Sequence, residues 1–414
     1  MKILFISAIL PYPLYSGGQI RIYNLLKTLS QDHEISLFSF IRDEKENQFR
    51  DKLAFCKRIE TVYRGHAWQA SYVFRSFVST YPFLMTTYAN RFMQQKIRTA
   101  LLDDHYDLVH IEPGYVFPSL PKISVPLVVA EHNIEHTIYE GYIRKFPIVP
   151  LRPLLYADVL KLMWWEKKIW RRADHLVAVS EDDKKVIGDS IDTKKITVVP
   201  NGVDLGQFPF SPKKYVDSDK PVFLFVGNFS WIQNQDAVVH LLFDLWPMII
   251  GGYPRATIRI VGRNMPDRMK KHIKDSRVKL LEGVSEISDE YRKADILLAP
   301  IRIGGGTKFK ILEAMASGVP VITTTQGAAG LDVSHGKELM IADSSEKMVE
   351  AVSLLLAQKG ERENMIKTAR RCIEEHYSWE RIAKILANVW ENVATNPNIP
   401  KDNNTIAPPA GRLK

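Results

Sequence analysis

The chain has 414 residues, of which 45% are hydrophobic and 25% are charged, and its net charge is +9. This composition is ordinary for a soluble globular protein, and the length predicts two domains rather than one. No apolar run approaches the roughly 18 residues needed to span a bilayer, which excludes a transmembrane helix. The two cysteines, Cys56 and Cys372, exclude a disulfide framework and a metal-binding cysteine pattern, and they fit a reducing, cytoplasmic compartment.

The first ten residues, MKILFISAIL, combine one lysine with an apolar run and have the look of a short signal sequence. No convincing small-residue cleavage site follows them. Residues 11–18 fit better as the loop after a buried strand. We therefore expect a first strand at residues 3–8 and a cytoplasmic protein.

Short apolar and β-branched runs alternate with helix-length segments along most of the chain. We expect strands at residues 3–8, 35–40, 108–111, 127–130, 176–179 and 196–199, and at 222–226, 257–261, 278–281, 296–299, 319–323 and 339–341. Such strands, bounded by Gly or Pro, indicate parallel doubly wound sheets. Two sets of them predict an α/β fold with two Rossmann-like domains.

The boundary between these domains is expected within residues 200–220, which are rich in Pro, Gly, Lys and Asp and have no periodicity. We place the N-terminal domain at 1–205 and the C-terminal domain at 206–375. Residues 66–100 are aromatic and of mixed polarity, and we expect helices beside a cleft. The tail from 396 to 414 is predicted to be disordered.

The strongest chemical signal is a run of three glycines at 304–306, between an expected strand and an expected helix that begins near Lys308. A glycine-rich turn into a helix presents backbone N–H groups to an anion, and the helix dipole favours negative charge. Thr307 and Lys310 add a hydroxyl and a second positive charge. Glu313, about one turn further, can accept hydrogen bonds from sugar hydroxyls. The segment therefore predicts a site for a nucleotide-diphosphate ligand that carries a sugar.

A plainer interpretation of this segment stays open. Glycine turns between strand and helix also occur for packing alone, and both lysines can be ordinary surface residues. The spacing is neither G-x-x-x-x-G-K-[ST] nor G-x-G-x-x-G, which argues against a P-loop and a dinucleotide site. No Asp-x-Asp pair or other carboxylate cluster accompanies the glycines, so we expect no metal ion and no cofactor apart from the donor substrate.

The positive charge is concentrated in residues 141–172, where eight Lys and Arg face two acidic residues and six aromatic residues accompany them. Basic and aromatic residues together suit an anionic membrane surface or an anionic substrate. Alternatively, the stretch is an amphipathic helix whose apolar side packs in the core, through Leu155, Val159, Leu162, Trp165 and Ile169. No nucleic-acid-binding motif accompanies the charge, so we expect no nucleic-acid partner.

Several motifs together carry a family likeness. They are SGGQIR at 16–21, AEHNIE at 130–135, ADHLVAVSEDD at 173–183, VVPNGVD at 198–204, FVGNFSWIQNQDA at 225–237, GGGTKFKILEAMASGVPVITTTQGAAGL at 304–331 and YSWERIAKIL at 377–386. With these motifs, from Met1 to about Val393, the chain resembles the retaining, nucleotide-sugar-dependent glycosyltransferases of family 4, which have the GT-B fold.

The resemblance implies two Rossmann-like domains that face a central cleft. The C-terminal domain is then expected to hold most of the nucleotide-sugar donor, and the N-terminal domain to bind a glycan or lipid-linked acceptor. Residues 376–395 match the family's closing helix, which returns to the N-terminal domain. Peripheral contact with an anionic membrane is expected from the basic stretch.

The resemblance also assigns roles to single residues. His132 matches the histidine beside the reacting sugar and is the expected catalytic residue, although a histidine at a strand end is often only a structural hydrogen-bonder. Glu112, Glu135 and His136 are weaker candidates. The expected donor-binding residues are Gly17, Gly18, Gly227, Asn228, Gly262, Arg263, Gly305, Gly306, Thr307, Lys308, Lys310 and Glu313.

Two departures from the family pattern matter. Glu313 matches the second acid of the E-x7-E motif, which grips the donor ribose, but Gly305 stands where the first acid belongs. Residues 227–240 also lack the Arg and Lys that the family often uses for the diphosphate. We expect that charge from Arg263, Arg302, Lys308 or Lys310.

The sequence therefore predicts a glycosyltransferase that builds a surface glycan or glycolipid without a metal ion, and the resemblance implies retention of configuration. Two alternatives stay open. One is a sugar-nucleotide epimerase on the same fold. The other is a non-catalytic sugar-nucleotide-binding subunit, an alternative that the missing first acid of the E-x7-E motif supports.

Overall fold

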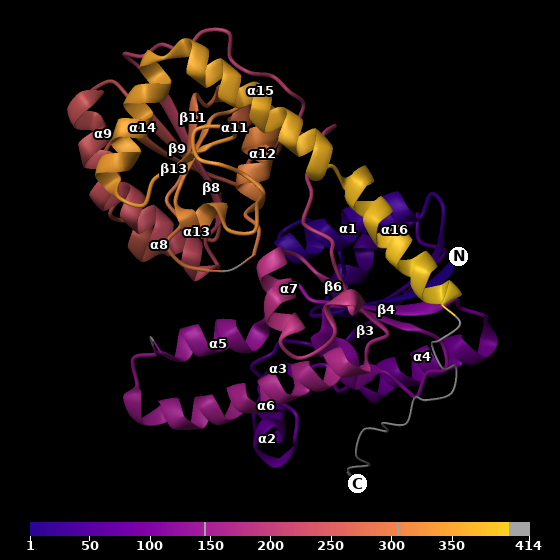
Figure 1. Cartoon of the computed structure of the whole chain (residues 1–414). Coiled ribbons are helices and arrows are strands. Elements are labelled where there is room, and N and C mark those ends of the chain that lie inside the picture. The colour runs from indigo at the N-terminus through magenta and orange to yellow at the C-terminus, as the bar shows by residue number, and fades with distance from the viewer. Residues whose placement is uncertain (145, 305, 397–414) are drawn as a thin grey trace. The chain divides into compact units, whose positions relative to one another are not determined.

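The computed structural model describes residues 1–144, 146–304 and 306–396. The predicted disordered tail lies outside these residues, apart from Asn396. The chain divides into two compact units (Figure 1). The N-terminal unit comprises Met1–Val199 and the residues from Ala383 onward, and the C-terminal unit comprises Pro200–Ile382.

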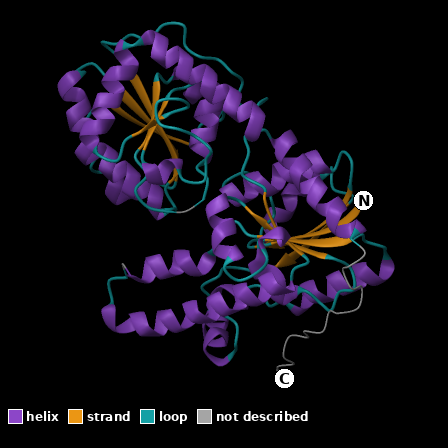
Figure 2. Cartoon of the chain, in the orientation of Figure 1, coloured by secondary structure: helices purple, strands orange, loops and turns teal. Residues whose placement is uncertain are grey.

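The N-terminal unit contains seven parallel strands in the order β3-β2-β1-β4-β5-β6-β7. Its strands are β1 (Lys2–Ser7), β2 (Glu34–Ile41), β3 (Arg58–Tyr63), β4 (Leu108–Glu112), β5 (Leu127–Ala130), β6 (His175–Ala178) and β7 (Ile196–Val198). Every residue of β4 and β5 is buried, because helices cover both faces of the sheet (Figure 2).

The helices of this unit connect and cover the strands. They are α1 (Gly17–Leu29), α2 (Ala70–Val78), α3 (Phe83–Thr86), α4 (Arg91–Asp103), α5 (Glu135–Arg144), α6 (Arg152–Arg172), α7 (Glu181–Gly188) and most of α16 (Trp379–Thr395), with 3-10 turns η1 (Glu44–Leu53), η2 (Gly114–Ser119), η3 (Val149–Leu151) and η4 (Thr193–Lys195). Polar caps fix several starts: the side chains of Ser16, Asn90 and Ser180 accept hydrogen bonds from the first turns of α1, α4 and α7.

Strand β3 is the strand that the sequence did not predict. It lies at the edge of the sheet, and of its six residues only Val62 is buried. The other positions include Arg58 and Glu60, which form an ion pair. An edge strand with a partly solvent-exposed face lacks the continuous apolar run that predicts a buried strand.

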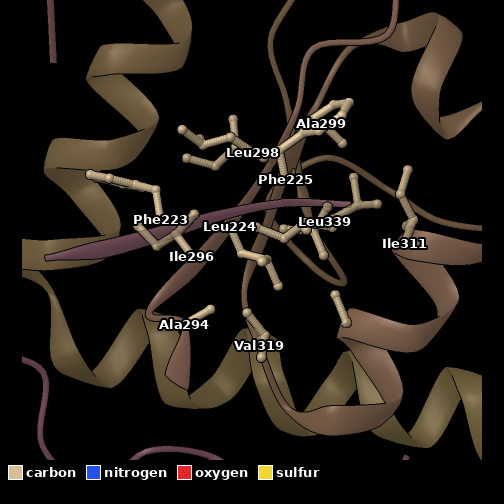
Figure 3. Packing of buried hydrophobic residues seen from close by; sticks show 14 of the residues in the cluster. Phe223, Leu224, Phe225, Ala294, Ile296, Leu298, Ala299, Ile311, Val319 and Leu339 are labelled. Atoms are coloured by element: carbon tan, nitrogen blue, oxygen red, sulfur yellow. The ribbon is translucent and has the colours of Figure 1, made fainter. Parts of the chain in front are cut away.

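The C-terminal unit repeats this architecture with six parallel strands in the order β10-β9-β8-β11-β12-β13. The strands are β8 (Val222–Asn228), β9 (Thr257–Arg263), β10 (Val278–Glu282), β11 (Ile296–Ala299), β12 (Val321–Thr323) and β13 (Met340–Ile341). The helices are α8 (Ile232–His240), the π-turn η5 (Leu241–Leu245), α9 (Trp246–Gly252), α10 (Asp267–Lys270), α11 (Ile287–Lys293), α12 (Phe309–Ser317), α13 (Thr325–Ala328), α14 (Ser345–Ala357) and α15 (Lys359–His376). Figure 3 shows Phe225, Leu298 and Ile311 among the buried side chains that join β8, β11 and α12.

The two sheets confirm the predicted α/β class with two Rossmann-like parallel sheets. In each unit the strand order reverses beside the first strand, between β1 and β4 and between β8 and β11. Ligands of open α/β sheets bind outside the carboxyl ends of the strands at such a reversal. Glu112 ends β4, Asn228 ends β8, and the glycine run follows β11, so several predicted site residues lie at these two points.

Candidate active site

The glycine segment leads directly into helix α12, as the sequence predicted. Gly304 and Gly306 have φ of +101° and +70°, conformations that other residues rarely adopt. Gly305 lies outside the described residues. Lys308 occupies the N-cap position, and no side chain caps the first turn of α12 in the part of the chain that the structure describes. The backbone N–H groups of the first turn of α12 are therefore suited to binding an anion.

The polar residues of this segment are buried, which argues against their being ordinary surface residues. Thr307, Lys308 and Lys310 are each less than a tenth exposed. The Thr307 hydroxyl has no hydrogen-bond partner among the described residues. Burial lowers the pKa of Lys308 to about 8 and, with Lys308 nearby, that of Lys310 to about 7. Two lysines whose charged forms are disfavoured by burial make a site that suits a negative ligand.

Asn234 of α8 holds Lys310 in place, and no sequence pattern pointed to this residue. The Lys310 Nζ donates to Asn234 Oδ1 at 2.7 Å and lies 4.4 Å from the centre of the Phe225 ring. The Asn234 Nδ2 donates to the carbonyl of Asn228 at 2.8 Å. A Cβ on Gly227 would come within 2.9 Å of Asn234. Asn234 thus ties the end of β8 to the lysine.

Glu313 lies in α12, and Tyr291 of α11 fixes its side chain. The fully buried Tyr291 hydroxyl donates to Glu313 Oε2 at 2.6 Å. Burial raises the pKa of Glu313, against the opposing effects of Tyr291 and Lys310. One carboxylate oxygen is therefore committed to the protein. The expected contact of Glu313 with the donor ribose stays a prediction.

Gly227 and Gly262, at the ends of β8 and β9, were expected to bind the donor, but strand pairing also accounts for a glycine here. A Cβ on Gly262 would lie 1.9 Å from the carbonyl oxygen of Gly227, because the two residues are paired across the strands. The sheet itself thus requires glycine at Gly262, with or without a nucleotide nearby. Asn228 and Arg263 end these strands, and their donor contacts stay predictions. Arg302 forms an ion pair with Asp236 at 2.8 Å.

In the N-terminal unit, Gly17 and Gly18 do not form a loop. They are the first residues of α1, whose N-cap is Ser16. A Cβ on Gly18 would come within 3.3 Å of both Cε1 and Nδ1 of His132. The structure thus brings the amino end of α1 against the predicted catalytic histidine, and glycine provides the room for its ring.

Glu112 is the centre of a buried polar network that includes His132. Its Oε1 accepts from Arg21 Nε and lies 2.7 Å from His132 Nε2, and its Oε2 lies 3.2 Å from His110 Nε2. Arg21 also donates to the carbonyl of Val199 at 2.9 Å. The sequence ranked Glu112 below His132, but the geometry makes Glu112 the residue that orients the histidine.

The charges of this network follow from its contacts. Burial alone would raise the pKa of Glu112, but Arg21 and the two histidines outweigh it and hold that pKa well below its usual range. Trp390 of α16 donates from Nε1 to His110 Nδ1 at 3.0 Å, which leaves the proton of a neutral His110 on Nε2, facing Glu112. Burial lowers the pKa of His110 and favours this neutral form. With Nε2 of His132 against the carboxylate, its Nδ1 lies on the side of Gly18.

The two other candidates near β5, Glu135 and His136, both contact Glu166 of α6. His136 Nδ1 lies 2.6 Å from Glu166, and the same carboxylate accepts from the backbone N–H groups of Glu135 and His136 at the start of α5. Burial, with Glu166 adding to it, raises the pKa of Glu135 to about 7. Glu166 therefore joins α6 to the start of α5.

Neither a metal cluster nor a membrane span is found in the part of the chain that the structure describes. No group of three or more His, Cys, Asp or Glu residues there is placed to hold a metal ion. None of its helices combines the length and apolar character needed to cross a bilayer.

Known proteins with related sequences and folds cover almost the whole chain. A family model described as Glycosyltransferase Family 4 matches residues 15–207, and one described as Glycosyl transferases group 1 matches residues 220–358. An uncharacterized 44.6 kDa protein in the cps region of Klebsiella pneumoniae is 25% identical, over 83% of this chain and 87% of that protein. A phosphatidyl-myo-inositol mannosyltransferase of Mycobacterium leprae is 24% identical, over 73% of this chain and 78% of that protein.

Solved structures share the fold at low sequence identity. HepE from Anabaena, in complex with UDP-glucose, has a TM-score of 0.64 and 16% identity, and the match covers 95% of this chain and 100% of that one.

Proposed function

Because the chain belongs to the family 4 type of glycosyltransferases with the GT-B fold, we propose that it transfers a hexose from a nucleoside-diphosphate sugar to a glycan or lipid-linked acceptor. The proposal includes retention of configuration and independence of metal ions. The observation that carries it is the segment from Gly304 to Lys310. A helix start that no described side chain caps, a buried hydroxyl and two buried lysines occur together there.

This segment suits the chemistry of sugar transfer. As the bond between the anomeric carbon and the diphosphate breaks, negative charge grows on the leaving group. Preorganised N–H donors and lysines stabilise that charge without reorganising. Lys310 is held by Asn234 before any ligand arrives, so little side-chain entropy is lost on binding.

His132 is proposed to act on the reacting sugar or the acceptor. Its Nε2 is engaged by Glu112, and its Nδ1 side faces the start of α1. The ring is 16% exposed, which leaves part of it open to a substrate. A histidine oriented by a buried carboxylate has a fixed position, which a transition-state contact requires.

We expect transfer of labelled sugar to continue in EDTA, because lysines and a helix start, rather than carboxylates, surround the expected diphosphate position. The measurement is product formation with a panel of nucleotide sugars and an extract of bacterial glycolipids, with and without chelator. Separate detection of transfer, epimerised donor and hydrolysed donor distinguishes a transferase from the two alternatives. Loss of turnover in EDTA that returns with added Mg²⁺ would contradict metal independence.

The acceptor is proposed to be lipid-linked, because an apolar surface covers one region of the N-terminal unit. Helices α5 and α6 form a hairpin (Figure 1). The hairpin and α2, which contacts α6, expose large apolar side chains. They are Phe74, Phe77 and Val78 on α2, and Ile148, Val149, Leu151, Leu154, Leu160 and Trp164 on the hairpin, each between 44% and 66% exposed. The other side of α6 is core through Val159, Leu162, Trp165 and Ile169, as the alternative interpretation predicted, whereas Leu155 is only half-buried.

This surface combines apolar residues with the net charge of +6 in residues 141–172, a pattern typical of interfacial binding. Lys161 is not free for a membrane, since its Nζ donates to the carbonyls of Ser76 and Ser79 in and after α2. The relative from Mycobacterium leprae is named for a phosphatidyl-inositol acceptor, which supports a lipid-linked acceptor here.

Changing Ile148, Val149 and Leu151 together to serine is expected to abolish sedimentation with anionic vesicles, because these residues supply the exposed apolar area at the hairpin tip. A matched control changes Ile232, Val239 and Phe243, which are 40–59% exposed in the C-terminal unit. Binding of the wild-type protein should weaken in high salt, since each basic residue near an anionic bilayer contributes about 1 kcal/mol. Equal binding by both triple variants would assign the contact to another surface.

A further inference from the structure

Arg64 is a buried arginine with no counter-charge among the described residues. It directly follows β3 and is 4% exposed. Its Nε is sealed from solvent and has no hydrogen-bond partner, and its guanidinium forms no ion pair within residues 1–144, 146–304 and 306–396. Two other arginines are buried among these residues, and each has a partner: Arg21 pairs with Glu112, and Arg362 donates to the carbonyl of Leu355.

The contacts of Arg64 do not replace a counter-ion. The guanidinium lies 4.7 Å from the centre of the Tyr88 ring, a cation–π contact. Such a contact is weaker than the desolvation cost of a buried charge. Glu135 is close enough to raise the pKa of Tyr88, but it forms no ion pair with Arg64 in the described residues. A buried charge left in this condition is expected at a functional position rather than a structural one.

Arg64 lies at the edge of the sheet where the predicted site residues of this unit lie. It follows the carboxyl end of β3, on the same edge of the sheet as Glu112 at the end of β4 and His132 after β5. The rings of Tyr88 and Tyr115 of η2 are in tilted contact, with centres 5.0 Å apart. The hydroxyl of Tyr72 on α2 donates to the Arg64 carbonyl at 2.8 Å, which attaches this position to the exposed apolar helix.

We propose that Arg64 recognises an anionic phosphate group on the acceptor, with the phenol groups of Tyr88 and Tyr115 beside it. This inference rests on the proposed function and specifies its acceptor class. The planar guanidinium donates two parallel hydrogen bonds to phosphate oxygens, a geometry that a lysine does not reproduce. The phosphate belongs either to a lipid headgroup or to a soluble sugar phosphate.

The test measures thermal unfolding of the full chain with inorganic phosphate, with glucose 1-phosphate and with glucose. We expect both phosphates, but not glucose, to raise the Tm by a few degrees. Because the predicted donor site can also bind phosphate, these variants are compared in a Lys310→Ala background. In that background Arg64→Met should lose the rise, Arg64→Lys should retain only part of it, and Arg58→Met, at the other end of β3, should keep it. Ligand-free Arg64→Met should be no less stable than wild type, because a buried uncompensated charge is removed.

A phosphate response that is absent from the Lys310→Ala protein, or unchanged when Arg64→Met is added to it, would overturn the inference. So would an Arg64→Met protein that is strongly destabilised or unfolded, since that result gives Arg64 a structural role. Sedimentation with phosphatidylcholine vesicles that contain phosphatidylinositol identifies the source. Arg64-dependent sedimentation indicates a lipid phosphate, and a response to glucose 1-phosphate alone indicates a soluble one. Nucleotide binding, measured separately, should be unchanged in Arg64→Met. If the wild type bound no nucleotide, the proposed function would be wrong, but the conclusion about phosphate binding at Arg64 would be unaffected.

Discussion

Replacing Lys310 with methionine is expected to weaken nucleoside-diphosphate binding by about tenfold or more, and to leave the ligand-free protein at least as stable as before. A hydrogen bond to a charged group contributes about 1.5–3 kcal/mol, which sets the loss of affinity. The buried ammonium of Lys310, only 8% exposed, is costly without an anion. Methionine fills nearly the same volume against Phe225 without that cost.

The pH dependence gives the same prediction an independent test. The pKa of Lys310 falls from its ordinary value of 10.5 to about 7 in the fold, mainly through burial. Between these values the unfolded chain binds more protons, so the stability of the ligand-free protein should rise as the pH increases from about 7 toward 10. A bound diphosphate restores the charged lysine. Binding should therefore take up protons and weaken between pH 7 and pH 9.

Isothermal titration in buffers of different ionisation enthalpy measures this proton uptake, with a nucleoside diphosphate first selected by a thermal-shift screen. Lys359→Met is the control, because Lys359 is an exposed lysine on α15. Lys310→Met should take up fewer protons on binding, and its stability should rise less with pH. The proton uptake and the rise that remain are expected from Lys308, whose pKa is about 8. Equal affinity in Lys310→Met and wild type would remove Lys310 from the donor site.

Local sequence patterns predicted the parts of the fold and site that depend on neighbours in the chain. Successive short runs of apolar residues predicted the two parallel sheets, and the glycine run predicted the start of α12. Strand β3 was missed because an edge strand needs few buried residues. Gly17 and Gly18 were expected in a loop, because two glycines after a Pro-rich segment indicate a turn more often than a helix start.

The groups that hold the site residues in place could not be found in this way. Asn234 is 76 residues from Lys310, and Trp390 is 280 residues from His110. Contacts of this range are set by the packing of whole elements, on which sequence spacing carries no information. Glu112 was visible as a strand-end acid, but its links to Arg21 and to two histidines appear only once α1, β4 and β5 meet.

Glu112→Gln is expected to lower both stability and turnover, while leaving donor affinity nearly unchanged. The substitution keeps the shape of the side chain but leaves Arg21 buried without its counter-charge, at a cost of about 3–5 kcal/mol. The wild-type Glu112 pKa lies well below its usual range, so its contribution is complete above that range and is lost as the pH falls through the folded value. The variant should lack this loss of stability at acid pH.

His132→Ala separates the catalytic effect from the structural one. A contact that strengthens in the transition state contributes about 10²-fold to turnover, and its removal has little effect on ground-state binding. We expect His132→Ala to lose about that much turnover at saturating donor, with donor affinity retained and much less destabilisation than in Glu112→Gln. Glu60→Gln is the control for charge removal, since its ion pairs with Arg58 and Lys96 are partly exposed and contribute little.

The paired variants distinguish a positioning carboxylate from a structural one. If Glu112 acts through His132, Glu112→Gln should reduce turnover much less in a His132→Ala background than in the wild type, because the residue it orients is already gone. Its stability cost, which comes from Arg21, should persist in both backgrounds. Equal losses of turnover in the two backgrounds would show that Glu112 affects the reaction only through the fold. Unchanged turnover in His132→Ala would assign the histidine a purely structural role.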